Sequence, residues 1–263
     1  MGDRFRGRRV LVTGSSRGIG AGIAERMAAE GADVVLTART LEAHDHLAGS
    51  LNETAARLRT YGTNVGIVVA DLTDEADRAR IVPEAAEALG GHIEILINNA
   101  AASIQAPLIG FPVKRRNINL ALAALPAMVA AGEGWIVNLS SGAAKQWDGP
   151  PFDVGPQGPR TAAYGASKAA LNRITNGLAA EVYGTGVRVN TVEPRAAVLS
   201  EGAAALVGAT LRPDQIESME EMVEGTLVLC DCAPEVTGRI TVSLDNIAEW
   251  GVTVRGLDGQ LLD

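Results

Sequence analysis

The sequence is poor in the features that mark disulfide-linked, membrane-spanning or nucleic-acid-binding proteins. Its 263 residues include only two cysteines, Cys230 and Cys232, and this pair predicts neither a disulfide framework nor a zinc site. No apolar run reaches the ~20 residues of a membrane-spanning helix, since the longest candidate, Leu120 to Ala131, is interrupted by Pro126. The net charge of −8 argues against nucleic acid or an anionic membrane as the main partner.

No export signal is visible either. Basic residues at Arg4, Arg6, Arg8 and Arg9 lead directly into Val10-Leu11-Val12, which is too short for a signal-peptide core. With so little cysteine, we expect a cytoplasmic location. Hydrophobic residues make up 47% and charged residues 21%, which is typical of a soluble globular protein with a substantial core.

Apolar, β-branched runs alternate with helical segments along the chain. The predicted strands are Val10–Thr13, Val34–Thr37, Val65–Ala70, Ile93–Ile97, Trp135–Leu139, Val187–Val192 and Ile240–Leu244. The predicted helices are Gly20–Glu30, Glu53–Tyr61, Asp74–Leu89 with Thr73 as N-cap, Ala162–Tyr183 and a helix around Ser218–Cys230. With no repeat or linker visible, this order predicts one α/β domain over residues 1–263, built on a mostly parallel, doubly wound sheet of about seven strands.

A glycine-rich turn, Thr13-Gly14-Ser15-Ser16-Arg17-Gly18-Ile19-Gly20, joins the first predicted strand to the first helix. Glycines allow a tight turn and let the backbone approach a pyrophosphate, whose charge suits a helix N-terminus. The spacing differs from G-x-G-x-x-G, so this motif alone also fits a purely structural turn. In context it predicts a dinucleotide site.

The second motif is Tyr164-Gly165-Ala166-Ser167-Lys168. Tyr164 and Lys168 are one helical turn apart and share a face. A phenol has a pKa near ~10, and a neighbouring ammonium favours the phenolate and lowers that pKa. Such a pair can give a proton to a carbonyl oxygen or take one from an alcohol. Together the two motifs predict hydride transfer between a nicotinamide and a carbonyl or alcohol carbon.

These motifs and their order resemble those of the short-chain dehydrogenase/reductase family. Six motifs of the family have counterparts here in the same order. They are T-G-x-x-x-G-I-G at Thr13–Gly20, D-L at Asp71-Leu72, N-N-A-G at Asn98-Asn99-Ala100-Ala101, a serine pair at Ser140-Ser141, Y-x-x-x-K at Tyr164–Lys168 and V-N-x-x-x-P at Val189–Pro194. The match runs from about Arg8 to Leu244. The resemblance implies a Rossmann-type fold, a small-molecule carbonyl or alcohol substrate, and a homodimer or homotetramer.

The resemblance also implies a role for each matched residue. Tyr164 would move the proton, Lys168 would lower the pKa of Tyr164 and bind the nicotinamide ribose, and Ser141 would hydrogen-bond the substrate oxygen. Asn119 would complete a tetrad through a water-linked proton path. The implied cofactor contacts are Gly14, Ser16, Arg17, Gly18, Ile19, Gly20, Arg39, Asp71, Leu72, Asn98, Ala100, Tyr164, Lys168 and Pro194. Without that context, Asp71 would be a cap or turn residue and Asn119 a surface amide.

The end of the second predicted strand bears on the choice of cofactor. An NAD-preferring site usually places an acidic residue there for the ribose 2′-hydroxyl, and this chain has Ala38. Arg39 follows, and Arg17 lies in the glycine turn, so two guanidinium groups can meet a 2′-phosphate. This favours NADP(H) over NAD(H). The alternative is that Arg39 stacks on adenine or faces solvent.

Four departures from the family pattern affect these expectations. The helix between Asn119 and Pro126 is about two turns shorter than in the family, where it places the tetrad asparagine and packs against a partner subunit. Asn117 is therefore an alternative to Asn119. The loop from Lys145 to Arg160 is enlarged and carries Trp147 and Phe152, so it either walls the substrate pocket or is surface decoration. Arg195 replaces the usual glycine after Pro194. A tail over residues 245–263 replaces the usual ending and would close the pocket or support assembly.

Other features carry less information. His44 and His46 resemble metal ligands but lack nearby partners, so we predict no metal site. The loop from His44 to Leu51 resembles a branch of the family that includes hydroxysteroid-dehydrogenase-like proteins. Lys114-Arg115-Arg116 is interpreted as a solvated cluster and the two cysteines as the end of a buried helix.

The sequence therefore predicts an NADP(H)-dependent oxidoreductase with a Ser-Tyr-Lys(-Asn) site. A catalytically weak NADP(H)-binding sensor or regulatory protein is the alternative, because of the shortened helix and Arg195. An epimerase or dehydratase of the extended branch is disfavoured by the short chain and the glycine spacing.

Overall fold

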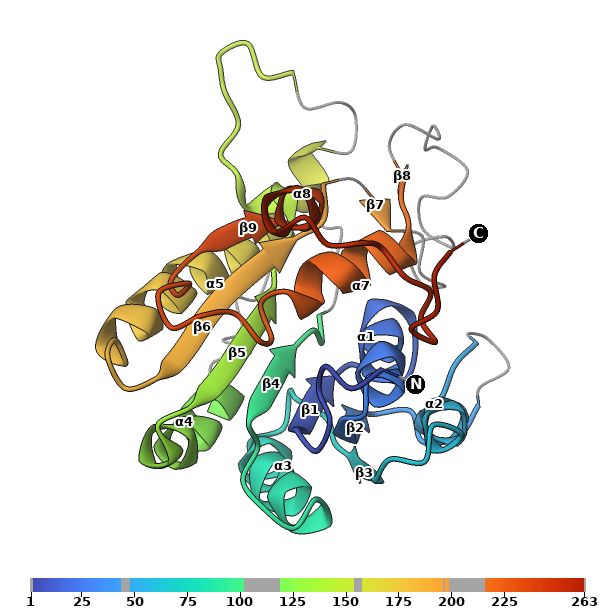
Figure 1. The fold of residues 1–263 in the computed structure, drawn as a ribbon. Helices are drawn as coiled ribbons and strands as arrows, with labels where there is room; N and C mark the ends of the chain where they lie inside the picture. Colours follow the sequence, from blue (N-terminus) through green and yellow to red (C-terminus); the bar gives the residue numbers. More distant parts are fainter. Residues whose placement is uncertain are drawn as a thin grey trace.

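The computed structural model describes residues 2–43, 48–101, 119–153, 158–195, 197–198 and 216–262. Its centre is a parallel seven-stranded sheet in the order β3-β2-β1-β4-β5-β6-β9, and helices cover both faces (Figure 1). This confirms the predicted Rossmann-type α/β fold. The strand order reverses between β1 and β4, and in such sheets ligands bind at this switch point, outside the carboxyl ends of the strands.

The sheet consists of the predicted runs, of which the inner strands are almost wholly buried and the two edge strands partly exposed. Its strands are β1 (Arg9–Thr13), β2 (Asp33–Ala38), β3 (Val65–Val69), β4 (Ile95–Asn98), β5 (Gly134–Leu139), β6 (Val187–Glu193) and β9 (Ile240–Val242). A separate two-stranded sheet, β7 (Ala197–Val198) and β8 (Ile216–Glu217), was not predicted.

The described part of the chain contains the five predicted helices, which agree with the predicted segments to within a few residues at most ends, and two more, at residues 119–131 and 243–250, for which no helix bounds were predicted. They are α1 (Gly18–Ala29), α2 (Leu51–Arg59), α3 (Glu75–Ala88), α4 (Asn119–Ala131), α5 (Ala162–Glu181), α7 (Met219–Leu227) and α8 (Ser243–Trp250), with the 3-10 turns η1 (Gly142–Ala144) and η2 (Gly158–Thr161).

Two local expectations were wrong. The N-cap of α3 is Asp74, whose carboxylate accepts the Asp77 amide at 3.0 Å, and not Thr73. The last strand ends at Val242, where the chain enters α8, so residues 243–250 of the expected strand and tail are helical. The apolar run Ile240–Leu244 was too short to separate strand from helix.

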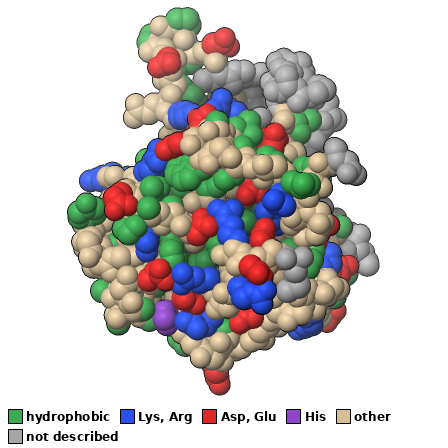
Figure 2. Space-filling view, viewed as in Figure 1, with side chains coloured by type: hydrophobic (Ala, Val, Ile, Leu, Met, Phe, Trp, Pro, Cys, Tyr) green, Lys and Arg blue, Asp and Glu red, His purple; other side chains and the backbone are tan. Residues whose placement is uncertain are grey.

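The core has two parts, one on each face of the sheet. Side chains of α1, α2 and α7 pack on one face, and side chains of α3, α4 and α5 pack on the other. In the described part of the chain, no helix has the length and apolar character needed to cross a membrane. On the face shown in Figure 2, acidic and basic side chains are interspersed.

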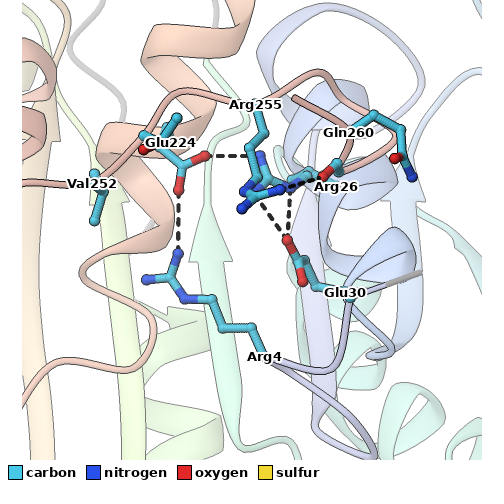
Figure 3. A pocket seen from close by; sticks show the side chains of 10 residues that line it. Arg4, Arg26, Glu30, Glu224, Val252, Arg255 and Gln260 are labelled. Atoms are coloured by element: carbon cyan, nitrogen blue, oxygen red, sulfur yellow. Dashed lines mark hydrogen bonds and ion pairs between the residues drawn. The ribbon is translucent and has the colours of Figure 1, made fainter. Parts of the chain in front are cut away.

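A polar cavity of about 480 Å³ lies away from the switch point, among the N-terminal segment, α1, α7 and residues 252–260 (Figure 3). Buried Arg26 donates to Glu30 at 2.9 Å and to Glu224 at 2.8 Å, and Glu224 also accepts from Arg4 at 3.3 Å. Each of these charged groups therefore has a partner of opposite sign. The network joins the start of the described chain to α1 and α7.

Candidate active site

The glycine turn lies between β1 and α1 at the carboxyl edge of the sheet. Gly14 and Gly18 have φ angles of 67° and 58°, in the left-handed region that residues with a Cβ atom rarely adopt. A Cβ on Gly20 would lie 2.4 Å from the Gly14 carbonyl oxygen, so only glycine fits at that position. Ser15 fastens the turn to the sheet by donating to the Val12 carbonyl at 2.9 Å and accepting the Thr37 amide at 3.0 Å.

The first turn of α1 suits an anionic group. Arg17 occupies the N-cap without a capping hydrogen bond from its side chain, and the first turn contains no acidic residue. By contrast, Ser50 and Asp74 cap α2 and α3 with their side chains. Backbone amides at a helix start with no acidic side chain, next to a tight glycine turn, fit the pyrophosphate of a dinucleotide. Ser16, Ile19 and Gly20, also predicted as cofactor contacts, belong to this same turn and helix start.

Arg17 and Arg39 both reach the region beyond β2, where the adenosine ribose of a dinucleotide would lie. Arg17 Nη2 donates to the Gly49 carbonyl at 2.7 Å. Arg39, whose side chain is 74% exposed, lies 3.9 Å from Asp71 Oδ2 at the end of β3. Hydrogen bonding by Thr73 and the charge of Arg39 lower the pKa of the Asp71 carboxyl. Burial acts in the opposite direction, and the net shift is downward. Leu72 follows and packs against the core.

The end of β4 is tied to the glycine turn. Thr13 Oγ1 accepts the amides of Asn99 at 3.0 Å and Ala100 at 2.9 Å. The Asn99 side chain donates to the carbonyls of Thr13 at 2.8 Å and Gly14 at 3.1 Å. Sequence reasoning named Asn98 and Ala100 but missed this role of Asn99, although its position in the N-N-A motif was a signal. Asn98 instead bonds Asn138 on β5 at 2.9 Å.

Ser141, Tyr164 and Lys168 converge between η1 and α5. Ser141 is the N-cap of η1, and Tyr164 and Lys168 project from the first turns of α5. Gly165 allows this close packing, because a Cβ there would lie 2.4 Å from the Ala143 carbonyl oxygen. Lys168 Nζ lies 5.7 Å from the Tyr164 ring centroid and donates to the Leu139 carbonyl at 2.6 Å.

Burial sets the proton affinities of the two α5 groups. It raises the pKa of Tyr164 above its usual value, while a hydrogen bond with Ser141 acts in the opposite direction. Burial lowers the pKa of Lys168 to about 8. The sequence predicted a lowered Tyr164 pKa, but the net shift is upward, because burial outweighs the effect of Ser141. Lys168 lies beside the phenol, whose ionised form its ammonium would stabilise.

The fourth residue of the predicted tetrad is Asn119. It is the exposed first residue of α4, and among the described residues it makes no hydrogen bond to Ser141, Tyr164 or Lys168. Asn117, His44, His46 and the cluster Lys114-Arg115-Arg116 lie outside the described residues.

Two of the departures from the family pattern lie at the end of β6 and in the enlarged loop after η1. Pro194 is half-buried at the end of β6, and the Arg195 guanidinium pairs with Asp245 of α8. The described part of the enlarged loop, residues 145–153, extends from the body of the molecule (Figure 1). Trp147 and Phe152 are 40% and 61% exposed, so neither ring is buried in the site.

This geometry defines the class of protein: a parallel switch-point fold with a dinucleotide turn and a half-buried tyrosine beside a buried lysine, as in NAD(P)-dependent dehydrogenases and reductases. The chain belongs to the short chain dehydrogenase family, whose model matches residues 8–206. Hydroxysteroid dehydrogenase-like protein 2 of Danio rerio is 27% identical over 254 residues, which cover 92% of this chain and 58% of that protein. The chain thus spans little more than half the length of this curated relative.

Solved structures agree over nearly the whole chain. A short chain dehydrogenase of Mycobacterium thermoresistibile has a TM-score of 0.78 at 26% identity, covering 98% of this chain and 94% of that one. A 3-oxoacyl (acyl-carrier-protein) reductase of Agrobacterium tumefaciens, solved with NADP bound, has a TM-score of 0.74 at 28% identity, covering 90% and 93%.

Proposed function

We propose that the chain acts as one oxidoreductase domain that interconverts a carbonyl and an alcohol with NADP(H). The main support for this proposal is that Ser141, Tyr164 and Lys168 converge at the carboxyl edge of the sheet, where the glycine turn also lies. The family match and the dehydrogenase and reductase names of the relatives favour an enzyme over a regulatory binding protein.

The chain's own residues would do the proton chemistry. In the reductive direction, the Ser141 hydroxyl donates a hydrogen bond to the substrate oxygen, and Tyr164 transfers its proton to that oxygen. The Lys168 ammonium stabilises the phenolate that results, because opposite charges in a buried site attract strongly. The bound nicotinamide supplies or accepts the hydride. Asn119 is proposed only as a contributor to proton supply, since the structure shows no bond from it to the other three.

The test of this function is a turnover screen with NADPH and NADH. The names of the relatives suggest 3-oxoacyl thioesters and hydroxysteroids or ketosteroids as substrate classes, and simple ketones serve as general acceptors. Turnover of at least one class, with oxidation of the nicotinamide, supports the proposal. Cofactor binding without turnover of any carbonyl or alcohol would favour the regulatory alternative.

We expect NADPH to bind roughly tenfold to a hundredfold tighter than NADH, because a charge-assisted hydrogen bond contributes about 1.5–3 kcal/mol. Arg39 is solvent-accessible beyond β2, and Ala38 provides no carboxylate to repel a 2′-phosphate. Arg39→Ala should remove much of the preference, and Ala38→Asp should reverse it. Fluorescence titration with both cofactors measures the dissociation constants.

The matched control for this prediction is Arg173→Ala, which removes an exposed arginine from α5. It should leave both dissociation constants unchanged. Tighter binding of NADH by the unmodified protein would overturn the NADP(H) assignment and leave the family assignment intact.

We further propose that the protein forms a homodimer or homotetramer through α4. Helix α4 carries no charged residue, and Leu122 and Val129 on its outer face are 50% and 39% exposed. Exposed apolar surfaces of this kind mark association sites. We expect light scattering to give a mass of two or four chains, and Leu122→Lys to lower it. A monomeric mass for the unmodified protein would contradict the proposal.

A further inference from the structure

The last residue of β6 is a buried carboxylate that the predicted site does not use. Glu193 follows Val192 in a wholly buried strand and is 3% exposed. A carboxylate in such a place needs a partner, because removal of an ion from water is costly unless its charge is compensated. Sequence reasoning missed it, because the predicted strand ended at Val192, one residue before Glu193.

Its partner is Lys145, whose Nζ lies 3.2 Å from Glu193 Oε1. The Lys145 side chain is 73% exposed and therefore reaches from the surface to the buried carboxylate. Lys145 also occupies a particular place in the chain: it is the C-cap of η1, the single turn that Ser141 opens, and it is the first residue of the enlarged loop.

The turn between Ser141 and Lys145 is short and held by few bonds. The Ala144 amide donates to the Ser141 carbonyl at 2.9 Å, and the Lys145 amide donates to the Gly142 carbonyl at 3.1 Å. On its N-terminal side, the Ser140 amide bonds the Val192 carbonyl of β6 at 2.8 Å. The ion pair supplies a second connection to β6 on the other side of the turn. Ser141 thus lies between two attachments to the end of the same strand.

That strand end leads directly into Pro194, a predicted cofactor contact. We propose that Glu193 is a positioning residue: through Lys145 it holds the Ser141 turn and the base of the loop against the end of β6. The orientation of Ser141 toward Tyr164 would then depend on a charge that touches neither substrate nor cofactor. This inference rests on the proposed function of Ser141.

The experiment compares Glu193→Gln, Lys145→Met, Lys145→Arg and the double variant Lys145→Met/Glu193→Gln. A misplaced hydrogen-bond donor lowers the rate of the chemical step, so kcat of Glu193→Gln should fall roughly tenfold, with NADPH affinity unchanged. Lys145→Met should behave similarly, Lys145→Arg should retain most activity, and the double variant should be no worse than either single variant. Hydrogen exchange of the amides at Ala144 and Lys145 should accelerate in Glu193→Gln.

The matched control is Glu249→Gln, which breaks the exposed Arg239–Glu249 ion pair and should change none of these quantities. If Glu193→Gln changed neither hydrogen exchange nor kcat, the Lys145–Glu193 ion pair would not hold the turn, and the proposal would be wrong. Faster exchange with unchanged kcat would overturn the positioning role and leave the proposed function standing. If the unmodified protein turned over no carbonyl or alcohol, the proposed function would fail on its own, and exchange would still decide whether the pair holds the turn.

Discussion

Replacement of Tyr164 by phenylalanine should lower kcat by about 10²–10⁴, the usual contribution of general acid–base catalysis. The variant keeps the aromatic ring, which packs beside Lys168 and η1, and loses only the hydroxyl that hydrogen-bonds with Ser141. The expected loss therefore lies in the proton transfer. NADPH affinity should change little, because the glycine turn and the arginines beyond β2 remain in place. Steady-state kinetics and a cofactor titration on the same preparation separate the two effects.

Tyr183→Phe is the matched control. It makes the same chemical change just beyond the end of α5, where the ring is 73% exposed. It should leave kcat, KM and cofactor binding as they are. Near-full turnover by Tyr164→Phe would contradict the assigned proton donor, and it would favour the interpretation of the chain as a binding protein in which the Ser141–Tyr164 pair is structural.

The sequence predicted those parts of the site whose chemistry depends on local spacing. The positions of Gly14, Gly18 and Gly20 reflect a turn that few other residues can form, and the interval between Tyr164 and Lys168 is one turn of a helix. For the same reason, predicted runs of four to six residues marked all seven strands of the main sheet. These features follow from steric and periodic rules that act within a few residues.

Features that depend on how the folded chain arranges its segments were missed. Thr73 and Asp74 are both good helix caps, and the structure uses Asp74 while the Thr73 amide binds the Asp71 side chain at 2.8 Å. The cap is thus decided by how the chain leaves β3. Likewise, nothing near Glu193 or Lys145 in the sequence shows that the two residues meet. The same limit applies to Arg4 and Glu224, which pair across 220 positions.

Substitution of Glu224 should have the largest effect on stability. Glu224 is 2% exposed and accepts from Arg26 at 2.8 Å and Arg4 at 3.3 Å, so one carboxylate joins the N-terminal segment, α1 and α7 (Figure 3). Glu224→Gln keeps the shape of the side chain but removes the negative charge that faces both arginines. Its amide group also directs N–H hydrogens at one of them. Arg26, with a side chain 2% exposed, cannot compensate by moving into water.

We therefore expect Glu224→Gln to lower the free energy of unfolding by about 3 kcal/mol, since loss of one partner leaves buried charge uncompensated. The double variant Arg26→Met/Glu224→Met should lose less than the sum of its single variants, because removal of both charges leaves neither of the pair unpaired. Glu249→Gln, which breaks an exposed pair, should cost no more than ~1 kcal/mol. Denaturant unfolding measures the free energy of unfolding of each variant. A loss for Glu224→Gln no larger than that for Glu249→Gln would mean that Glu30 and Asp231 alone compensate Arg26 and Arg4, and that the carboxylate of Glu224 does not hold α1 against α7.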